Sequence, residues 1–191
     1  MNRCAAIRMI EALAVTPERV PRTAPIDRAY TPTALDLSEA MRHAMDPAAD
    51  LPSSFVEEAC ARGDRCFAVL HGGSLASYAW CSALPTPLDE SLVVSVPPAW
   101  MYTYKAFTLP AHRGARLHGM LTALIVDDAA RRSYRGLMAC VDADNFRSLR
   151  SFTRVGAVHA GVIGAIRWFG AVRVLLSPGC RARGLRVTAV R

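Results

Sequence analysis

A strand that runs directly into a helix through an arginine-rich turn is the feature that most restricts how this chain can fold. The segment WMYTYKAFT, residues 100–108, has the aromatic and β-branched composition typical of a strand. Pro110 and then Arg113-Gly114 follow it. From residue 117 to residue 129, apolar residues recur at spacings of three and four, which predicts an amphipathic helix. A strand–turn–helix unit of this kind requires a sheet with a helix packed on one face.

The turn itself has the chemistry of an anion site. The first backbone N–H groups of a helix lack partners within the helix and carry a partial positive charge, which suits a phosphate. Gly114 allows the backbone to approach a ligand closely, and the side chains of Arg113 and Arg116 can grip a phosphate through paired hydrogen bonds. A solvent-facing turn that happens to be rich in arginine stays open as the alternative.

The rest of the chain predicts one α+β or α/β domain with a mixed sheet. Prolines at four positions in residues 1–34 indicate an irregular N-terminal arm, so we expect a single domain over residues 35–191. Residues 35–62 have helical patterns, and the Gly72-Gly73 pair between two β-rich runs indicates a hairpin. The proline-rich stretch 84–99 is interpreted as a loop around a short strand. A strand ending near residue 142, an amphipathic helix over 146–157 and one or two further strands complete the prediction.

Composition limits the choice of partner and compartment. The net charge is +7, and Lys105 is the sole lysine. The arginines are scattered and do not alternate with aromatic residues, so a small phosphorylated ligand is favoured over nucleic acid. The six cysteines include no C-x-x-C pair, which predicts no metal site and a reducing compartment. Because Arg8 and Glu11 interrupt the N-terminal apolar run, and no run approaches the ~20 residues of a membrane helix, we expect a soluble cytoplasmic protein with no membrane partner.

Several common catalytic motifs are missing from the sequence. It contains no G-x-G-x-x-G for a dinucleotide and no G-x-x-x-x-G-K-[ST] for a nucleoside triphosphate. It also lacks the G-x-S-x-G nucleophile elbow and the H-E-x-x-H zinc motif. The turn at residues 113–118 therefore remains the clearest chemical signal in the chain.

Two segments together resemble the GNAT superfamily of N-acetyltransferases. The family motif V-x-P-x-y-R-g-x-G-x-G/A is similar to TLPAHRGARLH, residues 108–118, at the same spacing. The downstream family pattern N-x-x-a-x-x-l-Y-x-k-x-G-F is similar to the segment that begins at Asn145 and includes Phe152 and Gly156. The resemblance covers roughly residues 64–160, which would be the core of the domain, and it implies an α+β fold with a central mixed, twisted sheet flanked by helices. More loosely, the segments around 62–80 and 104–118 resemble GNAT-like proteins found with polysaccharide biosynthesis genes, which hints only at the acceptor.

The resemblance implies acetyl-CoA as co-substrate and a binding role for each matching residue. The end of the strand, at Ala106, Phe107 and Thr108, would hydrogen-bond the pantetheine arm like an added strand. Asn145 would reach the pantetheine where the two central strands separate, and Ser148 lies one helical turn further on. The backbone N–H groups that would cradle the diphosphate belong to the turn and the first turn of the helix: Arg113, Gly114, Ala115, Arg116, Leu117 and His118.

Three positions depart from the family pattern. Arg116 stands where the family usually has glycine, and His118 stands where it has glycine or alanine. Phe152 stands where many members have the tyrosine that protonates the departing thiolate, and phenylalanine has no proton to donate. These departures leave open whether another group serves, whether the thiolate leaves without help, or whether the chain catalyses no transfer.

The sequence only weakly specifies the general base that would remove the proton of the acceptor amine. Tyr102 and Tyr104 share one face of their strand, and we favour packing for each side chain over catalysis. Of the two, Tyr104 is the predicted catalytic residue, acting as a proton relay, with water as the alternative. The remaining candidates have ordinary roles as turn or surface residues: His71, Glu90, His112, His118, Asp142 and Asp144.

The sequence therefore predicts an N-acyltransferase that moves an acetyl group from acetyl-CoA directly to an amino group of a small-molecule acceptor. No covalent enzyme intermediate is needed, so Cys140 is expected to be a core residue. A GNAT-like CoA-binding or regulatory module without catalysis is the alternative, and a basic nucleic-acid binder is a weaker third. The acceptor, the acyl-chain length and the oligomeric state, including a homodimer, are left open.

Overall fold

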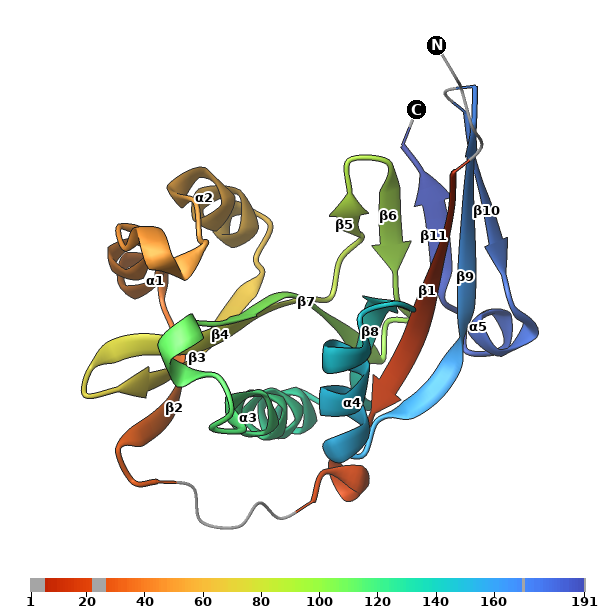
Figure 1. Ribbon diagram of the computed structural model, residues 1–191. Helices are drawn as coiled ribbons and strands as arrows, with labels where there is room; N and C mark the ends of the chain where they lie inside the picture. The colour runs from red at the N-terminus through yellow and green to blue at the C-terminus, as the bar shows by residue number, and fades with distance from the viewer. Residues whose placement is uncertain (1–5, 22–26, 170, 191) are drawn as a thin grey trace.

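The computed structural model describes residues 6–21, 27–169 and 171–190, and their strands form two sheets (Figure 1). The large sheet has eight strands in the order β10-β9-β1-β8-β7-β4-β3-β2, and the small sheet has three in the order β11-β6-β5. In the large sheet only β7 and β8 run parallel, and the other neighbours are antiparallel. This architecture confirms the predicted mixed sheet flanked by helices.

The strands of the large sheet are β1 (Ala6–Val15), β2 (Tyr30–Leu35), β3 (Arg65–His71), β4 (Ser74–Ser82), β7 (Trp100–Thr108), β8 (Gly136–Asp142), β9 (Val158–Trp168) and β10 (Ala171–Leu176). The strands of the small sheet are β5 (Thr86–Asp89), β6 (Leu92–Ser95) and β11 (Arg186–Ala189). The helices are α1 (Leu37–Ala44), α2 (Ser53–Ala61), α3 (Leu117–Arg131), α4 (Phe146–Arg154) and α5 (Pro178–Ala182).

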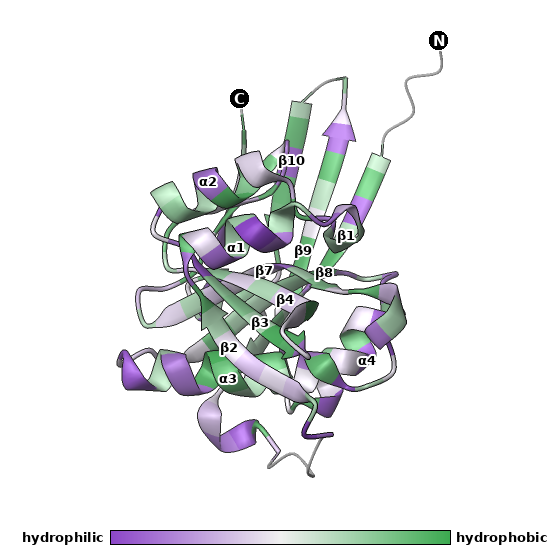
Figure 2. Ribbon diagram, turned by 90° about the vertical axis from the view of Figure 1, so that its left-hand side faces the viewer, coloured by the Kyte–Doolittle hydropathy of each residue, from purple (hydrophilic) through white to green (hydrophobic). Residues whose placement is uncertain are grey.

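Alternating side chains along the strands give the large sheet two buried faces. On one face, Phe67, Met101 and Leu137 of the strands form one apolar cluster with Leu121 and Ile125 of α3. Figure 2 shows the apolar positions of α3 in green beneath the strands β2, β3 and β4. The continuous stripe of α3 read from the sequence is therefore the surface that covers this face.

The opposite face of the sheet has two separate covers. Helices α1 and α2 lie over β3 and β4, where Val56 packs beside Trp80 in one apolar cluster. The small sheet lies over β1, β8 and β9, where Leu92 and Val94 pack beside Ile10 in another cluster. Tyr104 of β7 packs against both clusters. The two covers therefore meet the sheet on either side of the centre of β7, and they stand apart in Figure 1.

The predicted irregular arm over residues 1–34 is wrong where β1 and β2 form. β1 lies inside the sheet between β8 and β9, with Ile10 and Val15 buried on opposite faces. A strand buried on both faces has no simple alternation, which hides it in the sequence. Pro32 fits β2 because β2 is an edge strand, where a missing N–H costs no sheet hydrogen bond. Residues 1–5 and 22–26 of the arm lie outside the described residues.

The short strand predicted within 84–99 is β6, and part of the predicted loop forms a further strand, β5. β5 and β6 pair as a hairpin, and β11 from near the C-terminus pairs with β6. Because β11 is about ninety positions later in the chain, no local signal could identify the small sheet. Among the helices of the described residues, none combines the length and apolarity that a bilayer crossing needs.

Candidate active site

The turn between β7 and α3 leaves a row of backbone N–H groups without partners. After a short 3-10 turn at Pro110–His112, the backbone of Gly114 has φ +88° and that of Arg116 has φ +58°. Both residues are in the left-handed region, and α3 begins directly after them at Leu117 without a side-chain cap. Among the described residues, none accepts a hydrogen bond from the N–H groups of residues 114–118. These donors fit a diphosphate, which is what the sequence predicts for them.

The side chains of the two arginines in the turn do not hydrogen-bond the N–H groups of residues 114–118. Arg113 Nε donates to the carbonyl oxygen of Thr108 at 3.3 Å, and its guanidinium lies 6.0 Å from the centre of the Phe107 ring. Arg113 and Arg116 are both exposed. Two exposed positive charges at the start of a helix add to the attraction of its N-terminus for an anion.

His118 is turned against α4. Its ring meets the ring of Phe152 edge to face, with 4.6 Å between the ring centres. The Nδ1 atom is buried and has no hydrogen-bond partner among the described residues. Burial lowers the pKa of His118 to about 4, so the imidazole is neutral at pH 7. Phe152 is 5% exposed and belongs to the core, so at this position α4 offers an apolar ring and no proton donor.

The two parallel strands separate just before this turn. Pairing between β7 and β8 runs from Trp100 opposite Gly136 to Thr103 opposite Ala139, and it stops there. β7 continues to Thr108 along β4, and β8 continues to Asp142 along β1. The edge of β7 that faces β8 therefore has no partner strand in the described structure over residues 104–108. Such an edge can hydrogen-bond an extended ligand as an added strand would.

A bulge in β7 shapes the start of this opening. Trp80 of β4 lies opposite Tyr104, and Tyr78 lies opposite Phe107, so Lys105 and Ala106 together face a single residue of β4. Lys105 has φ +45°, and its Nζ lies 3.0 Å from the carboxylate of Asp50. A bulge bends a strand and increases its twist, which helps β7 to diverge from β8.

Asn145 and Ser148 lie where β8 leads into α4. The Oδ1 atom of Asn145 accepts a hydrogen bond from the backbone N–H of Ser148 at 3.1 Å, so Asn145 caps α4. The amide NH₂ of Asn145 donates to none of the described residues, and the residue is exposed. The fold thus brings both predicted residues to the β8 side of the opening, opposite Ala106–Thr108. Their contacts with a coenzyme remain a prediction.

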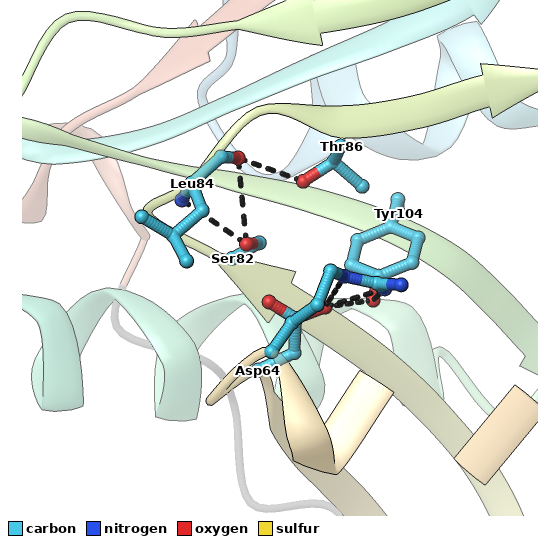
Figure 3. A network of polar contacts seen from close by, with 6 residues as sticks. Asp64, Ser82, Leu84, Thr86 and Tyr104 are labelled. Atoms are coloured by element: carbon cyan, nitrogen blue, oxygen red, sulfur yellow. Dashed lines mark hydrogen bonds and ion pairs between the residues drawn. The ribbon is translucent and has the colours of Figure 1, made fainter. Parts of the chain in front are cut away.

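Tyr104 forms a polar network with the connection between α2 and β3 (Figure 3). Its hydroxyl donates to Asp64 Oδ2 at 2.5 Å and accepts from Arg62 Nη2 at 2.9 Å. Arg62 also forms an ion pair with Asp64 at 2.7 Å. Burial, followed by the hydrogen bond to the Asp64 carboxylate, raises the pKa of Tyr104 above its ordinary value. The hydroxyl is therefore protonated at neutral pH, and it touches a carboxylate that can take its proton.

Tyr104 also lies at the point where β7 separates from β8. It directly follows Thr103, the last residue of β7 that pairs with β8. Its ring stacks on Tyr102 with 6.1 Å between centres and lies on the sheet face away from α3. Asp64 and Arg62 were not identified as functional residues in the sequence. These two residues contact Tyr104 from some forty positions earlier in the chain, and no local spacing pattern in the sequence reveals such a contact.

Four of the other candidate bases have ordinary structural partners, while Glu90 and Asp144 are exposed. Tyr102 is 1% exposed in the core, in agreement with the packing role favoured for it. Asp142 pairs with Arg8. His71 and His112 pack against Tyr30, whose hydroxyl lies 3.1 Å from Nδ1 of His112.

Cys140 lies on β8 at the same opening. Burial raises the pKa of its thiol to about 12, so the sulfur is protonated at neutral pH. A protonated thiol is a poor nucleophile. Cys140 packs against the apolar cluster that contains Ile10 and Tyr102, as expected for a core residue.

Comparison with known proteins agrees with this geometry. The sequence model described as "Acetyltransferase (GNAT) family" matches residues 33–157. No curated protein matches the sequence.

Solved structures share the fold at low sequence identity. A GCN5-related N-acetyltransferase from Kribbella flavida is 15% identical, with a TM-score of 0.55 over 95% of this chain and 63% of that chain. A GNAT-family acetyltransferase from Colwellia psychrerythraea is 14% identical, with a TM-score of 0.56 over 91% of this chain and 57% of that chain. A tandem GNAT protein from the clavulanic acid biosynthesis pathway is 16% identical, with a TM-score of 0.55 over 89% and 54%.

This chain therefore spans between about half and two-thirds of the length of these structures. The likeness to them concerns the fold, while the family model covers more than half of the sequence and includes both segments that carry the resemblance. By sequence and by fold, the chain belongs to the GNAT acetyltransferase family.

Proposed function

We propose that this protein is an N-acyltransferase that takes an acetyl group from acetyl-CoA and transfers it directly to the amino group of a small-molecule acceptor. The observation that carries the proposal is the row of unpartnered N–H groups at residues 114–118 beside the opening between β7 and β8. The N–H groups can hydrogen-bond a diphosphate, and the free edge of β7 can hydrogen-bond an extended pantetheine arm. Both occur in consecutive parts of one strand–turn–helix unit.

The proposed binding mode assigns a role to each part of the unit. The diphosphate lies on the N–H groups of residues 114–118, with Arg113 and Arg116 beside it. The pantetheine arm runs along the free edge of β7 at Ala106–Thr108, with Asn145 and Ser148 on the far side. This arrangement brings the thioester to the start of the opening, next to Tyr104.

Proton transfer then depends on Tyr104 and Asp64. An acceptor amine must lose its ammonium proton before it attacks, and the nitrogen must lose a second proton as the new C–N bond forms. Solvent takes the ammonium proton before the attack. As the C–N bond forms, the Tyr104 oxygen accepts the second proton from the nitrogen while its own proton passes to Asp64 Oδ2. The acetyl carbon loses its bond to sulfur, and the CoA thiolate leaves. Since Phe152 has no proton to give, solvent protonates the thiolate.

The second candidate is a GNAT-like module that binds CoA without catalysing transfer. It is favoured by the apolar Phe152 ring at the place where α4 reaches the site. Release of free thiol from acetyl-CoA in the presence of an amine, above the rate without protein, would eliminate this candidate.

The proposal is tested by titrating acetyl-CoA into the protein in a calorimeter. We expect saturable binding that Arg113→Glu weakens at least tenfold, because the substitution replaces a cation beside the diphosphate with an anion. Arg131→Glu is the matched control. It makes the same change of charge at the opposite end of α3, where Arg131 is exposed, and should leave the affinity nearly unchanged. Absence of binding by the unmodified protein at millimolar acetyl-CoA would refute the proposal.

A further inference from the structure

The end of the large sheet where β1 begins extends beyond α4. Asp142, just before α4, lies opposite Ile10 of β1, and Val158, the first residue of β9 after α4, lies opposite Ala14. α4 therefore lies beside the second half of β1. Residues 6–9 of β1 and their partners on β9 and β10 project past this helix, as Figure 1 and Figure 2 show.

The two faces of this projecting part differ in how they are covered. On one face, Ala165 of β9 and Val172 and Val174 of β10 pack with the small sheet. Because side chains alternate along a strand, the residues next to these point to the opposite face, which we call the open face. Its residues are Ile7, Met9, Gly164, Ile166, Trp168, Arg173 and Leu175.

The side chains of the open face are mostly apolar and exposed to solvent. Ile7, Met9, Trp168 and Leu175 are between 46% and 69% exposed, and Phe169, whose ring stacks on Trp168 with 5.9 Å between centres, is 69% exposed. Together these five side chains present roughly 600 Å² of surface, which reaches the size of the largest apolar patch on a typical monomer. An apolar patch of this size marks an interaction site.

The charges on the open face argue against several kinds of partner. Arg173 is the one charged residue among those that define it. Glu11, the next residue of β1 on the same side, forms an ion pair with His159 at 2.6 Å. Nucleic acids and anionic bilayers are held by several basic groups on the contacting surface. The partner that fits is therefore another flat, mainly apolar surface with little charge, and the open face itself is such a surface.

The open face also has a hollow between two of its side chains. A Cβ atom at Gly164 would lie 3.8 Å from both Met9 Sδ and Leu175 Cβ, so the glycine leaves a space between them. A two-fold axis brings the same patch of two copies together, so that a projecting side chain of each copy can enter the hollow of the other. Sheets that pack face to face lie about 10 Å apart, which leaves room for one layer of interlocked side chains.

The size of the open face agrees with a contact between two copies. The roughly 600 Å² of its exposed large side chains approaches the ~800 Å² that each partner contributes to a standard interface. The outer rim of β10, the edge strand of the large sheet, adds to this area. Because Arg173 lies on the edge strand, its guanidinium can reach solvent at the rim of the contact.

We propose that the open face is the contact between two copies of this chain, which pack sheet against sheet around a two-fold axis. The contact covers the exposed apolar side chains of β1, β9 and β10. This inference is independent of the proposed acetyl transfer, so either one can fail while the other holds.

Sedimentation velocity of the full chain over a range of concentrations tests the proposal. The unmodified protein is compared with Leu175→Glu and with Leu84→Glu. Leu84→Glu is the matched control, because Leu84 is 52% exposed, close to the 61% of Leu175, and lies between β4 and β5, outside the open face. Acrylamide quenching of tryptophan fluorescence is a second measurement that needs no variant, since Trp168 is 60% exposed and Trp80 is fully buried.

We expect a dimer with a dissociation constant of about 1 μM or lower. Leu175→Glu should raise this constant by about tenfold or more, because it brings a carboxylate from each copy into an apolar contact. Leu84→Glu should leave the constant unchanged. Quenching of Trp168 should decrease as the concentration of the unmodified protein rises through the constant.

The inference is overturned by a protein that stays monomeric at its highest soluble concentration, by a dimer that Leu175→Glu leaves intact, or by an equal loss of the dimer in Leu84→Glu. Vesicles of phosphatidylserine and phosphatidylcholine test the other occupant of such a face. Co-sedimentation of a monomer with these vesicles, lost in Leu175→Glu, would assign the open face to a bilayer and overturn the contact between copies.

Discussion

At the scale of single residues, the site depends on a hydroxyl held between two charges. Tyr104 lies at the point where β7 leaves β8, and its hydroxyl touches both Asp64 and Arg62. The Asp64 side chain is 1% exposed, so its carboxylate is shielded from water. In the proposed mechanism Asp64 takes the Tyr104 proton, which leaves the Arg62 guanidinium, 29% exposed, without its ion-pair partner.

Replacing Tyr104 with phenylalanine tests this role. We expect Tyr104→Phe to lower kcat by about 10² or more, the usual contribution of a positioned proton-transfer group, with little change in the affinity for acetyl-CoA. Tyr102→Phe removes the same hydroxyl from the stacked neighbour in the core and should leave kcat within about twofold. Steady-state thiol release and calorimetry supply the two readouts. An unchanged kcat for Tyr104→Phe would assign proton removal to water.

His118 gives the protein a pH dependence of stability with a defined sign. Its folded-state pKa is lowered by burial to about 4, while an unfolded histidine titrates near 6.5. Between these values the unfolded state binds more protons than the folded state. Stability is therefore lost as the pH falls from about 6.5 towards 4.

Denaturant unfolding at several pH values measures this loss. For the ligand-free protein we expect His118 to contribute a decrease of about 2 kcal/mol in unfolding free energy between pH 7.5 and pH 5. His118→Ala should show a decrease smaller by that amount, because all other titrating groups are common to both proteins. Parallel pH profiles for the two proteins would mean that the imidazole titrates normally in the folded state.

At the scale of elements, the turn before α3 is built from backbone conformations that are costly for most residues. Gly114 adopts its left-handed φ without strain, but Arg116 has a side chain and still adopts φ +58°. Arg116 stands where the family usually has glycine. The backbone of Arg116 thus has the left-handed conformation that exposes the N–H groups of residues 114–118, although arginine is less suited to it than glycine.

Replacing Arg116 with glycine should therefore stabilise the fold. We expect Arg116→Gly to raise the unfolding free energy by about 0.5–1 kcal/mol, because relief of left-handed strain exceeds the added entropy of glycine. Arg113→Gly makes the same change of side chain at φ −67° and should lower the unfolding free energy by a similar amount. Denaturant unfolding of both variants provides the comparison. Equal destabilisation by both would show that the turn is not strained at Arg116.

At the scale of the whole molecule, the sequence predicted the units that are local and missed those that are not. The helix over 117–131, the hairpin at Gly72-Gly73 and the helix that ends before Gly156 all follow from periodicity and turn chemistry within a few residues. β1 was missed because it is buried on both faces and pairs with strands more than a hundred residues later. The short strand β6 was predicted, but its pairing with β11 was missed because β11 lies near the C-terminus.

The site divides in the same way. Sequence spacing located the turn at Arg113–His118 and the helix start at Asn145, because a turn and a helix cap are both formed by residues close together in the chain. It could not locate Asp64 beside Tyr104, because the fold brings this pair together from separate elements.

The central claim is that CoA lies along the free edge of β7 with its diphosphate on the amides that start α3. Amide hydrogen exchange, measured with and without saturating CoA, tests it most directly because it reports on those N–H groups themselves. We expect slower exchange at residues 104–108 and 114–118 when CoA is bound, with the far end of α3 near Arg131 unchanged. CoA that binds and protects a different region, while residues 114–118 exchange as before, would contradict this binding mode.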